Sequence, residues 1–164
     1  MPEPSFVPLP GSERAPLAEA EIVGPLDPAQ RIEVTLVTRR RAELPPELVT
    51  GPSTLSRDDL ATRHGTDPAD IDLIRTVLAR HGIEVTDAEP GARRVRATGT
   101  AAALAEAFGA SLRLVRSPHR TAGQGTAEHR YREGGLHVPA GLAGIVQAVL
   151  GLDDRPQASP QVRQ

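Results

Sequence analysis

The segment RIEVTLVTR, residues 31–39, decides how the rest of this 164-residue chain is interpreted. Ile32, Val34 and Leu36 recur there at every second position. This period-two pattern is typical of a strand that buries one face and leaves the other accessible. We therefore expect the first strand of a folded domain to lie here.

The sequence on either side of this domain has a different character. Residues 1–30 contain seven prolines, a density that opposes helices and ladder hydrogen bonds and predicts an extended leader. The last twelve residues, DDRPQASPQVRQ, are polar and broken by proline. We expect a leader over residues 1–30, a folded domain over residues 31–152 and a linker over residues 153–164.

A short helix capped by Ser56 and ending at Gly65 is predicted first within the domain. Two further helices follow it. The first begins at Asp67 with Pro68 in its first turn, carries apolar residues at helical spacing and stops at Gly82. The second begins at Thr100, a capping residue, and places Leu104 and Phe108 on one face.

Alternating segments at residues 83–89 and 93–99 flank Pro90-Gly91 and predict a hairpin, and residues 111–117 predict a further strand. The resulting order, β-α-β-β-α-β, indicates an α+β fold of the ferredoxin-like α/β plait type: an antiparallel sheet with helices packed on one face. Residues 128–133, with Tyr131, predict a short edge strand, and residues 140–151 an extra C-terminal helix.

The other face of this sheet is expected to be largely polar. An antiparallel sheet can leave such a face in water, but isolated valines among charges also suit a protein partner. The residues expected there are Glu33, Thr35, Val37, Glu84, Thr86, Arg94, Arg96, Arg113 and Val115.

Composition excludes several classes of function. The net charge is −2 and the chain has one tyrosine, two phenylalanines and no tryptophan, whereas nucleic-acid binding needs clustered basic residues or stacking aromatics. There is no cysteine for disulfides or thiolate chemistry. No stretch approaches the length of a membrane span, and no signal peptide is recognisable. We expect neither a nucleic-acid nor a membrane partner.

No catalytic or metal-binding set is predicted. The serines lie at expected caps, loops and tails without a neighbouring base, and the five histidines are scattered. The pairs Asp58-Asp59 and Asp67 with Asp70 fall in first turns of helices, where carboxylates stabilise exposed N–H groups.

Five blocks of sequence resemble the pro-kumamolisin activation domain, the propeptide of sedolisin-type (kumamolisin-like) serine-carboxyl peptidases. In chain order they are VPLPGSER (7–14), RIEVTLVTRR (31–40), LSRDDLATRHGTDPADIDLI (55–74), the stretch 99–112, and YREGGLHVPAGLAGIVQAVLGLDDRP (131–156). Their order and the last block make the resemblance specific.

The resemblance implies a fold similar to subtilisin prosegments and a role as intramolecular chaperone and inhibitor until cleavage at acidic pH. It also implies a secreted precursor, with the peptidase domain following residue 164 and carrying its own Ser-Glu-Asp catalytic set and calcium site. The chain itself would then hold no catalytic residue, cofactor or metal, and its partner would be its own peptidase domain, in cis or in trans.

By the same resemblance, the open sheet face docks on the peptidase and the linker blocks the active-site cleft. The docking residues expected are Glu33, Thr35, Val37, Arg94, Arg96, Arg113 and Val115. The linker residues expected are Asp153, Asp154, Arg155, Pro156, Gln157 and Arg163.

A pH latch is a further hypothesis: outer-face arginines would pair with carboxylates of the peptidase and release them on acidification. The alternative to a propeptide is a free-standing ferredoxin-like domain that binds a protein or a small ligand, because a fold does not specify a function.

Overall fold

The computed structural model describes residues 6–14, 21–42, 56–118, 126–132 and 134–153. Its centre is a four-stranded antiparallel sheet with the strand order β4-β5-β3-β9. Helix α3 (Pro68–Arg80) follows the first of these strands and α4 (Ala101–Phe108) the third. The β-α-β-β-α-β order confirms the ferredoxin-like plait. The four strands are β3 (Arg31–Thr38), β4 (Glu84–Glu89), β5 (Arg94–Thr100) and β9 (Val146–Leu150).

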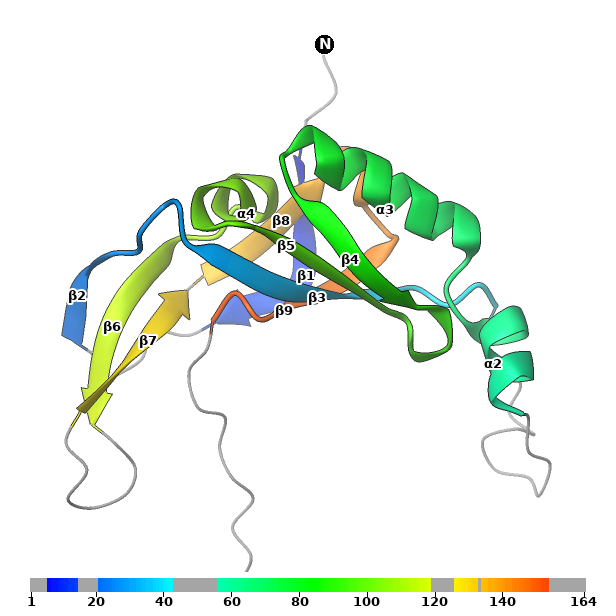
Figure 1. Ribbon diagram of the computed structural model, residues 1–164, viewed down its shortest axis with the longest axis horizontal. Helices are drawn as coiled ribbons and strands as arrows, with labels where there is room; N and C mark the ends of the chain where they lie inside the picture. Colours follow the sequence, from blue (N-terminus) through cyan, green and yellow to red (C-terminus); the bar gives the residue numbers. More distant parts are fainter. Residues whose placement is uncertain (1–5, 15–20, 43–55, 119–125, 133, 154–164) are drawn as a thin grey trace, which may run out of the picture.

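Strand β3 is central and obeys the expected alternation. Ile32, Val34 and Leu36 are at most 2% exposed, so this face of β3 lies in the core. Figure 1 shows α3 and α4 on one side of the sheet and no helix covering the middle of its other side, among the residues described. That uncovered side is called the open face below.

The helices begin and end where local chemistry requires. The Asp67 carboxylate accepts a 2.9 Å hydrogen bond from the Ala69 N–H, and Pro68 occupies the first turn of α3. The Thr100 hydroxyl accepts the Ala103 N–H at 3.1 Å and so caps α4. Each cap satisfies a donor that the helix itself leaves unpaired. Leu104 and Phe108 are fully buried, which confirms the expected apolar face of α4.

The fourth strand of the sheet is not the one expected. Residues 111–117 do form a strand, β6 (Leu112–Pro118), but it belongs to a separate three-stranded sheet with the order β2-β6-β7. The position beside β3 is taken by β9 instead, with Thr35 opposite Leu150 and Leu36 opposite Val149. The expected C-terminal helix over residues 140–151 is wrong: the segment forms a single 3₁₀ turn, η2 (Ala140–Leu142), and then β9.

A bulge explains why this segment imitates a helix. The register of β9 against β3 shifts by one residue between Val146 and Ala148, so Gln147 is the extra residue. The bulge brings both Val146 and Val149 to buried positions although they are three residues apart. Gly144, with φ of +78°, breaks the chain direction just before the strand. The apolar spacing therefore resembled a helix, while the backbone is extended.

The leader also contributes to the folded structure. Strand β1 (Phe6–Arg14) pairs antiparallel with β8 (Gly134–Pro139), and β2 (Glu21–Pro25) pairs with β6. Leu9 is only 5% exposed and belongs to the main core. The prolines of the leader therefore do not prevent ladder pairing, contrary to our expectation, since proline is tolerated on edge strands.

The expected short strand around Tyr131 is present as β7 (Thr126–Arg132), which pairs with β6. The β6–β7 hairpin projects from one end of the main sheet, and α2 (Arg57–His64) lies at the other end, beside the turn η1 (Pro90–Ala92). In Figure 1 both extend toward the side of the open face.

Candidate functional site

Three of the described histidines make local contacts. The Nδ1 atom of His64 lies 3.1 Å from the Ala42 carbonyl oxygen, and His81 ends α3. His137 donates from Nε2 to the Glu106 carbonyl at 3.1 Å, and its ring stacks on Phe6 at 4.3 Å. Within the described ranges, no three histidine, aspartate or glutamate side chains gather as metal ligands would. The surfaces of the fold are therefore considered next.

The open face combines a charged half with an uncharged half. On β4 and β5, acids lie opposite arginines: Asp87 opposite Arg96 and Glu89 opposite Arg94. On β3 and β9, the ladder places Val37 opposite Ala148, beside the Thr35–Leu150 pair. Opposed residues of an antiparallel pair share a face. An uncharged strip, defined as Thr35, Val37, Ala148 and Leu150, therefore runs beside a strip of mixed charge.

The strand register places most of the residues that we expected on this face opposite one another on neighbouring strands. Glu33 lies opposite Thr98, which also faces Glu84 across β4 and β5, and the Thr86 hydroxyl donates to the Arg96 carbonyl at 3.4 Å. The expected docking residues that lie on the open face are Glu33, Thr35, Val37, Arg94 and Arg96.

Arg113 and Val115 are not on this face. Both belong to β6, where Val115 is fully buried and Arg113 is exposed opposite Tyr131. The assignment of these two residues to the open face is therefore wrong. It followed from placing β6 beside β3, an edge that β9 occupies.

Leu150 is the principal residue that sequence reasoning missed. It is 48% exposed, and it is one of four exposed large hydrophobic residues among those that the structure describes. It lies in the segment 140–151, for which the sequence predicts a helix. If residues 146–150 are taken as a strand, Ala148 and Leu150 are two residues apart and lie on the same face. That spacing is the signal that would have identified both residues.

Two arginines, Arg39 after β3 and Arg93 before β5, make hydrogen bonds near the end of β3. Arg39 donates from Nε and Nη2 to the two carboxylate oxygens of Asp70, at 2.9 and 3.1 Å. These hydrogen bonds and the charge of Asp70 raise the pKa of Arg39. Arg93, in left-handed backbone conformation, donates to the Thr38 carbonyl at 3.2 Å, and burial lowers the pKa of its guanidinium. Arg39 thus joins the end of β3 to the Asp70 side chain of α3, and Arg93 bonds the backbone at Thr38.

The end of the described chain is attached to β7. The Arg130 guanidinium donates to the Gly151 carbonyl at 3.1 Å, and the Arg132 N–H donates to the Asp153 carboxylate at 3.3 Å. Leu152, between them, is 1% exposed. The last described residues are therefore held at a defined place, between β9 and β7. Of the expected linker residues only Asp153 is described; those outside the described residues are Asp154, Arg155, Pro156, Gln157 and Arg163.

The helices of this structure do not include a membrane span. Such a helix needs about 20 apolar residues, and no helix within the described ranges has that length and character.

Comparison with known proteins identifies the family of the chain. The family model of the pro-kumamolisin activation domain matches residues 18–155, and the chain belongs to that family. It is therefore an activation domain, the propeptide class of kumamolisin-type peptidases. Among curated proteins it is similar to kumamolisin of Bacillus sp. (strain MN-32), with 32% identity over 164 residues. That match covers 94% of this chain and 28% of the relative, so the chain spans little more than a quarter of that protein.

Proposed function

We propose that this chain keeps a kumamolisin-type serine-carboxyl peptidase domain inactive, assists its folding, and is released at acidic pH in a secreted precursor. The proposal rests on one combined observation: the chain belongs to this family, and one face of its sheet is covered by no described element. Most folded sheets of this kind bury one face on helices and expose the other to water or to a partner. Here the partner would be the peptidase domain.

The composition of the open face supports a protein partner. The Thr35, Val37, Ala148 and Leu150 strip offers apolar contact, and Leu150 is half exposed. The acids and arginines of β4 and β5 lie along one side of this strip and offer directional contacts. Protein interfaces usually combine apolar contact area with polar residues at its margin.

The exit point supports inhibition by a tethered segment. Asp153 is held against β7, so a linker that continues from it starts beside β9, at the margin of the open face. A short tether raises the effective concentration of its ligand into about the millimolar range. A peptidase docked on the open face would then meet residues after 153 as an extended segment in its cleft.

Acid release follows from the arginines of the open face. Arg94 and Arg96 are exposed there. If they pair with peptidase carboxylates, the pKa of those carboxylates is lower in the complex than in the free enzyme. The resulting affinity is present above the free pKa and is lost as the pH falls through the bound pKa. Acidification therefore weakens docking and favours cleavage of the released propeptide.

Inhibition in trans tests the proposal. Mature kumamolisin, freed of its own propeptide, is mixed with increasing amounts of the 164-residue chain, and residual cleavage of a peptide substrate is measured from about pH 3 to pH 7. We expect saturable inhibition near neutral pH that weakens toward acidic pH. Full activity at every pH and every concentration of the chain would contradict the proposal.

A further inference from the structure

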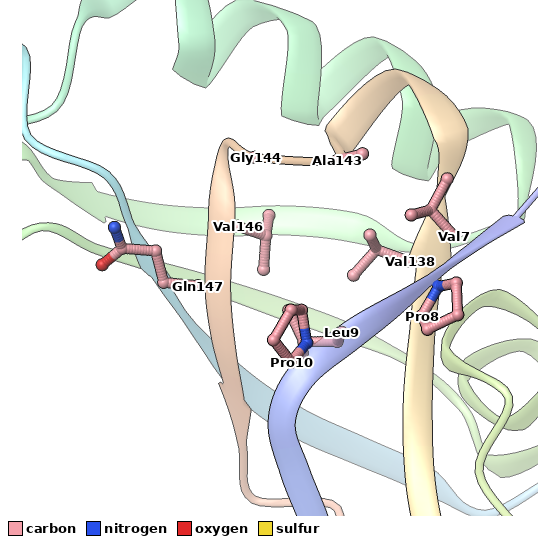
Figure 2. Close-up of a pocket in the computed structure, with 9 residues that line it drawn as sticks. All are labelled: Val7, Pro8, Leu9, Pro10, Val138, Ala143, Gly144, Val146 and Gln147. Atoms are coloured by element: carbon pink, nitrogen blue, oxygen red, sulfur yellow. The ribbon is translucent and has the colours of Figure 1, made fainter.

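A groove separates the free edges of β1 and β9. Within the described residues, β1 pairs only with β8 and β9 pairs only with β3, so the two edges face each other without a shared ladder. A cavity of about 460 Å³ lies between them. Figure 2 shows Leu9, Val138 and Val146 gathered in it, with Ala143 on its rim.

The groove is apolar and open to solvent. Leu9, Val138 and Val146 are each at most 5% exposed and form its base, whereas Pro8, Pro10 and Ala143 on its margin are exposed. Gln147 is the one lining residue with a polar side chain. An aliphatic cavity of this volume offers room for an apolar side chain and little to hold a charged one.

The edge of β1 argues against an added strand as the occupant. Pro8 and Pro10 lack the N–H groups that a third strand would need from this edge. Gly11, with φ of +77°, interrupts the strand immediately afterwards. The groove therefore suits the insertion of side chains rather than main-chain pairing.

The groove is continuous with the open face. A second cavity, of about 240 Å³, shares Leu9 and Gln147 with the first and extends along β9 to Ala148 and Leu150. Ala148 and Leu150 are also members of the uncharged strip. A partner that rests on the strip therefore lies beside the mouth of the groove.

We propose that the groove between β1 and β9 receives an apolar side chain from a protruding segment of the docked peptidase domain. The inference rests on the proposed function and deepens it, because it extends the interface beyond the sheet to the leader strand β1. The leader would then contribute directly to recognition of the peptidase. Burying one large aliphatic side chain is worth roughly a tenfold or greater change in affinity.

Cysteine labelling tests occupancy of the groove. The chain has no native cysteine, so Ala143→Cys and, as a control, Ala102→Cys each introduce a single thiol at an exposed site. Ala143 lies on the groove, and Ala102 lies on α4, away from the open face. The alkylation rate of each thiol is measured with and without mature kumamolisin. We expect at least tenfold slower alkylation at position 143 in the complex and an unchanged rate at position 102.

Charge insertion gives a second measurement. Ala143→Asp should raise the inhibition constant at least tenfold, since a carboxylate at the rim opposes an apolar occupant. Ala102→Asp should leave the constant within about twofold, and circular dichroism should show that both variants are folded.

The outcomes separate the two proposals. If the unaltered chain inhibits kumamolisin while Ala143→Cys is alkylated equally fast in the complex, the groove inference is overturned and the proposed function stands. If the unaltered chain neither binds nor inhibits, both fall together. Protection at both labelled positions would also overturn the groove assignment, because it would indicate general occlusion of the chain.

Discussion

Leu150 lies directly opposite Thr35 in the β3–β9 ladder and is half exposed on the open face. Thr35 also lies opposite Arg96 on its other side, so this row of three residues joins the uncharged strip to the charged strip. The row crosses the middle of the surface that we propose as the peptidase interface.

Replacing Leu150 by aspartate tests that surface. A charge in the uncharged strip should raise the inhibition constant by at least about tenfold, equivalent to about 1.4 kcal/mol. Stability should change little because the side chain is exposed. The matched control is Leu73→Asp: Leu73 is 39% exposed, but it lies on α3, on the helical side of the sheet. Equal losses of inhibition in both variants would contradict docking through the open face.

Removing two arginines tests the acid release. The double variant Arg94→Gln, Arg96→Gln should inhibit more weakly near neutral pH and lose less inhibition on acidification. The reason is that partner carboxylates would no longer have a lowered pKa in the complex. Inhibition constants measured between about pH 4 and 7 check this. The control variant, Arg75→Gln with Arg80→Gln on α3, removes the same charge and should keep the original pH dependence of the inhibition constant. If the inhibition constants of all three proteins changed with pH in parallel, the pH latch would be refuted.

Asp70→Ala should destabilise the fold by about 1–2 kcal/mol, because the substitution removes two hydrogen bonds to the charged Arg39. Chemical denaturation measures the change. Asp72→Ala, at an exposed position of the same helix, should cost less than about 0.5 kcal/mol.

The pH dependence of the stability lost in Asp70→Ala can also be predicted. Because the pKa of Arg39 is raised in the folded state, its contribution is fully present below its unfolded pKa and is lost only in strong alkali. Titration of Arg39 therefore adds no slope between acidic and neutral pH. A loss that vanished near neutral pH would contradict this assignment.

Gly109→Ala should be more destabilising than Gly82→Ala. Both glycines have positive φ, near +63° and +75°, so alanine is strained by about 1 kcal/mol at either site. At Gly109 a Cβ atom would also lie 2.5 Å from Nδ1 of His137, whereas at Gly82 it would meet nothing within 4 Å. Moving His137 disturbs its stacking on Phe6 and its bond to Glu106. Unfolding free energies should differ by about 1 kcal/mol or more, and equal values would show that His137 moves without cost.

Much of the plait could be predicted from short stretches of sequence. The alternation in β3, the caps Asp67 and Thr100 and the apolar faces of α3 and α4 all depend on interactions within one or two turns or along one strand. Such signals are contained in a few consecutive residues. For the same reason, Glu33, Thr35, Val37, Arg94 and Arg96 were assigned to the correct face.

The choice of partner strands could not be read in this way. Either β6 or β9 could be the strand beside β3, because both follow α4 in the chain. The bulge at Gln147 also made the sequence of β9 resemble that of a helix. Patterns within short stretches were enough to predict strands β3, β4 and β5, helices α3 and α4 and the family of the chain. That β9 closes the sheet, that Leu150 faces outward and that β1 borders a groove depends on packing of the whole domain, because several segments compete for the same edges.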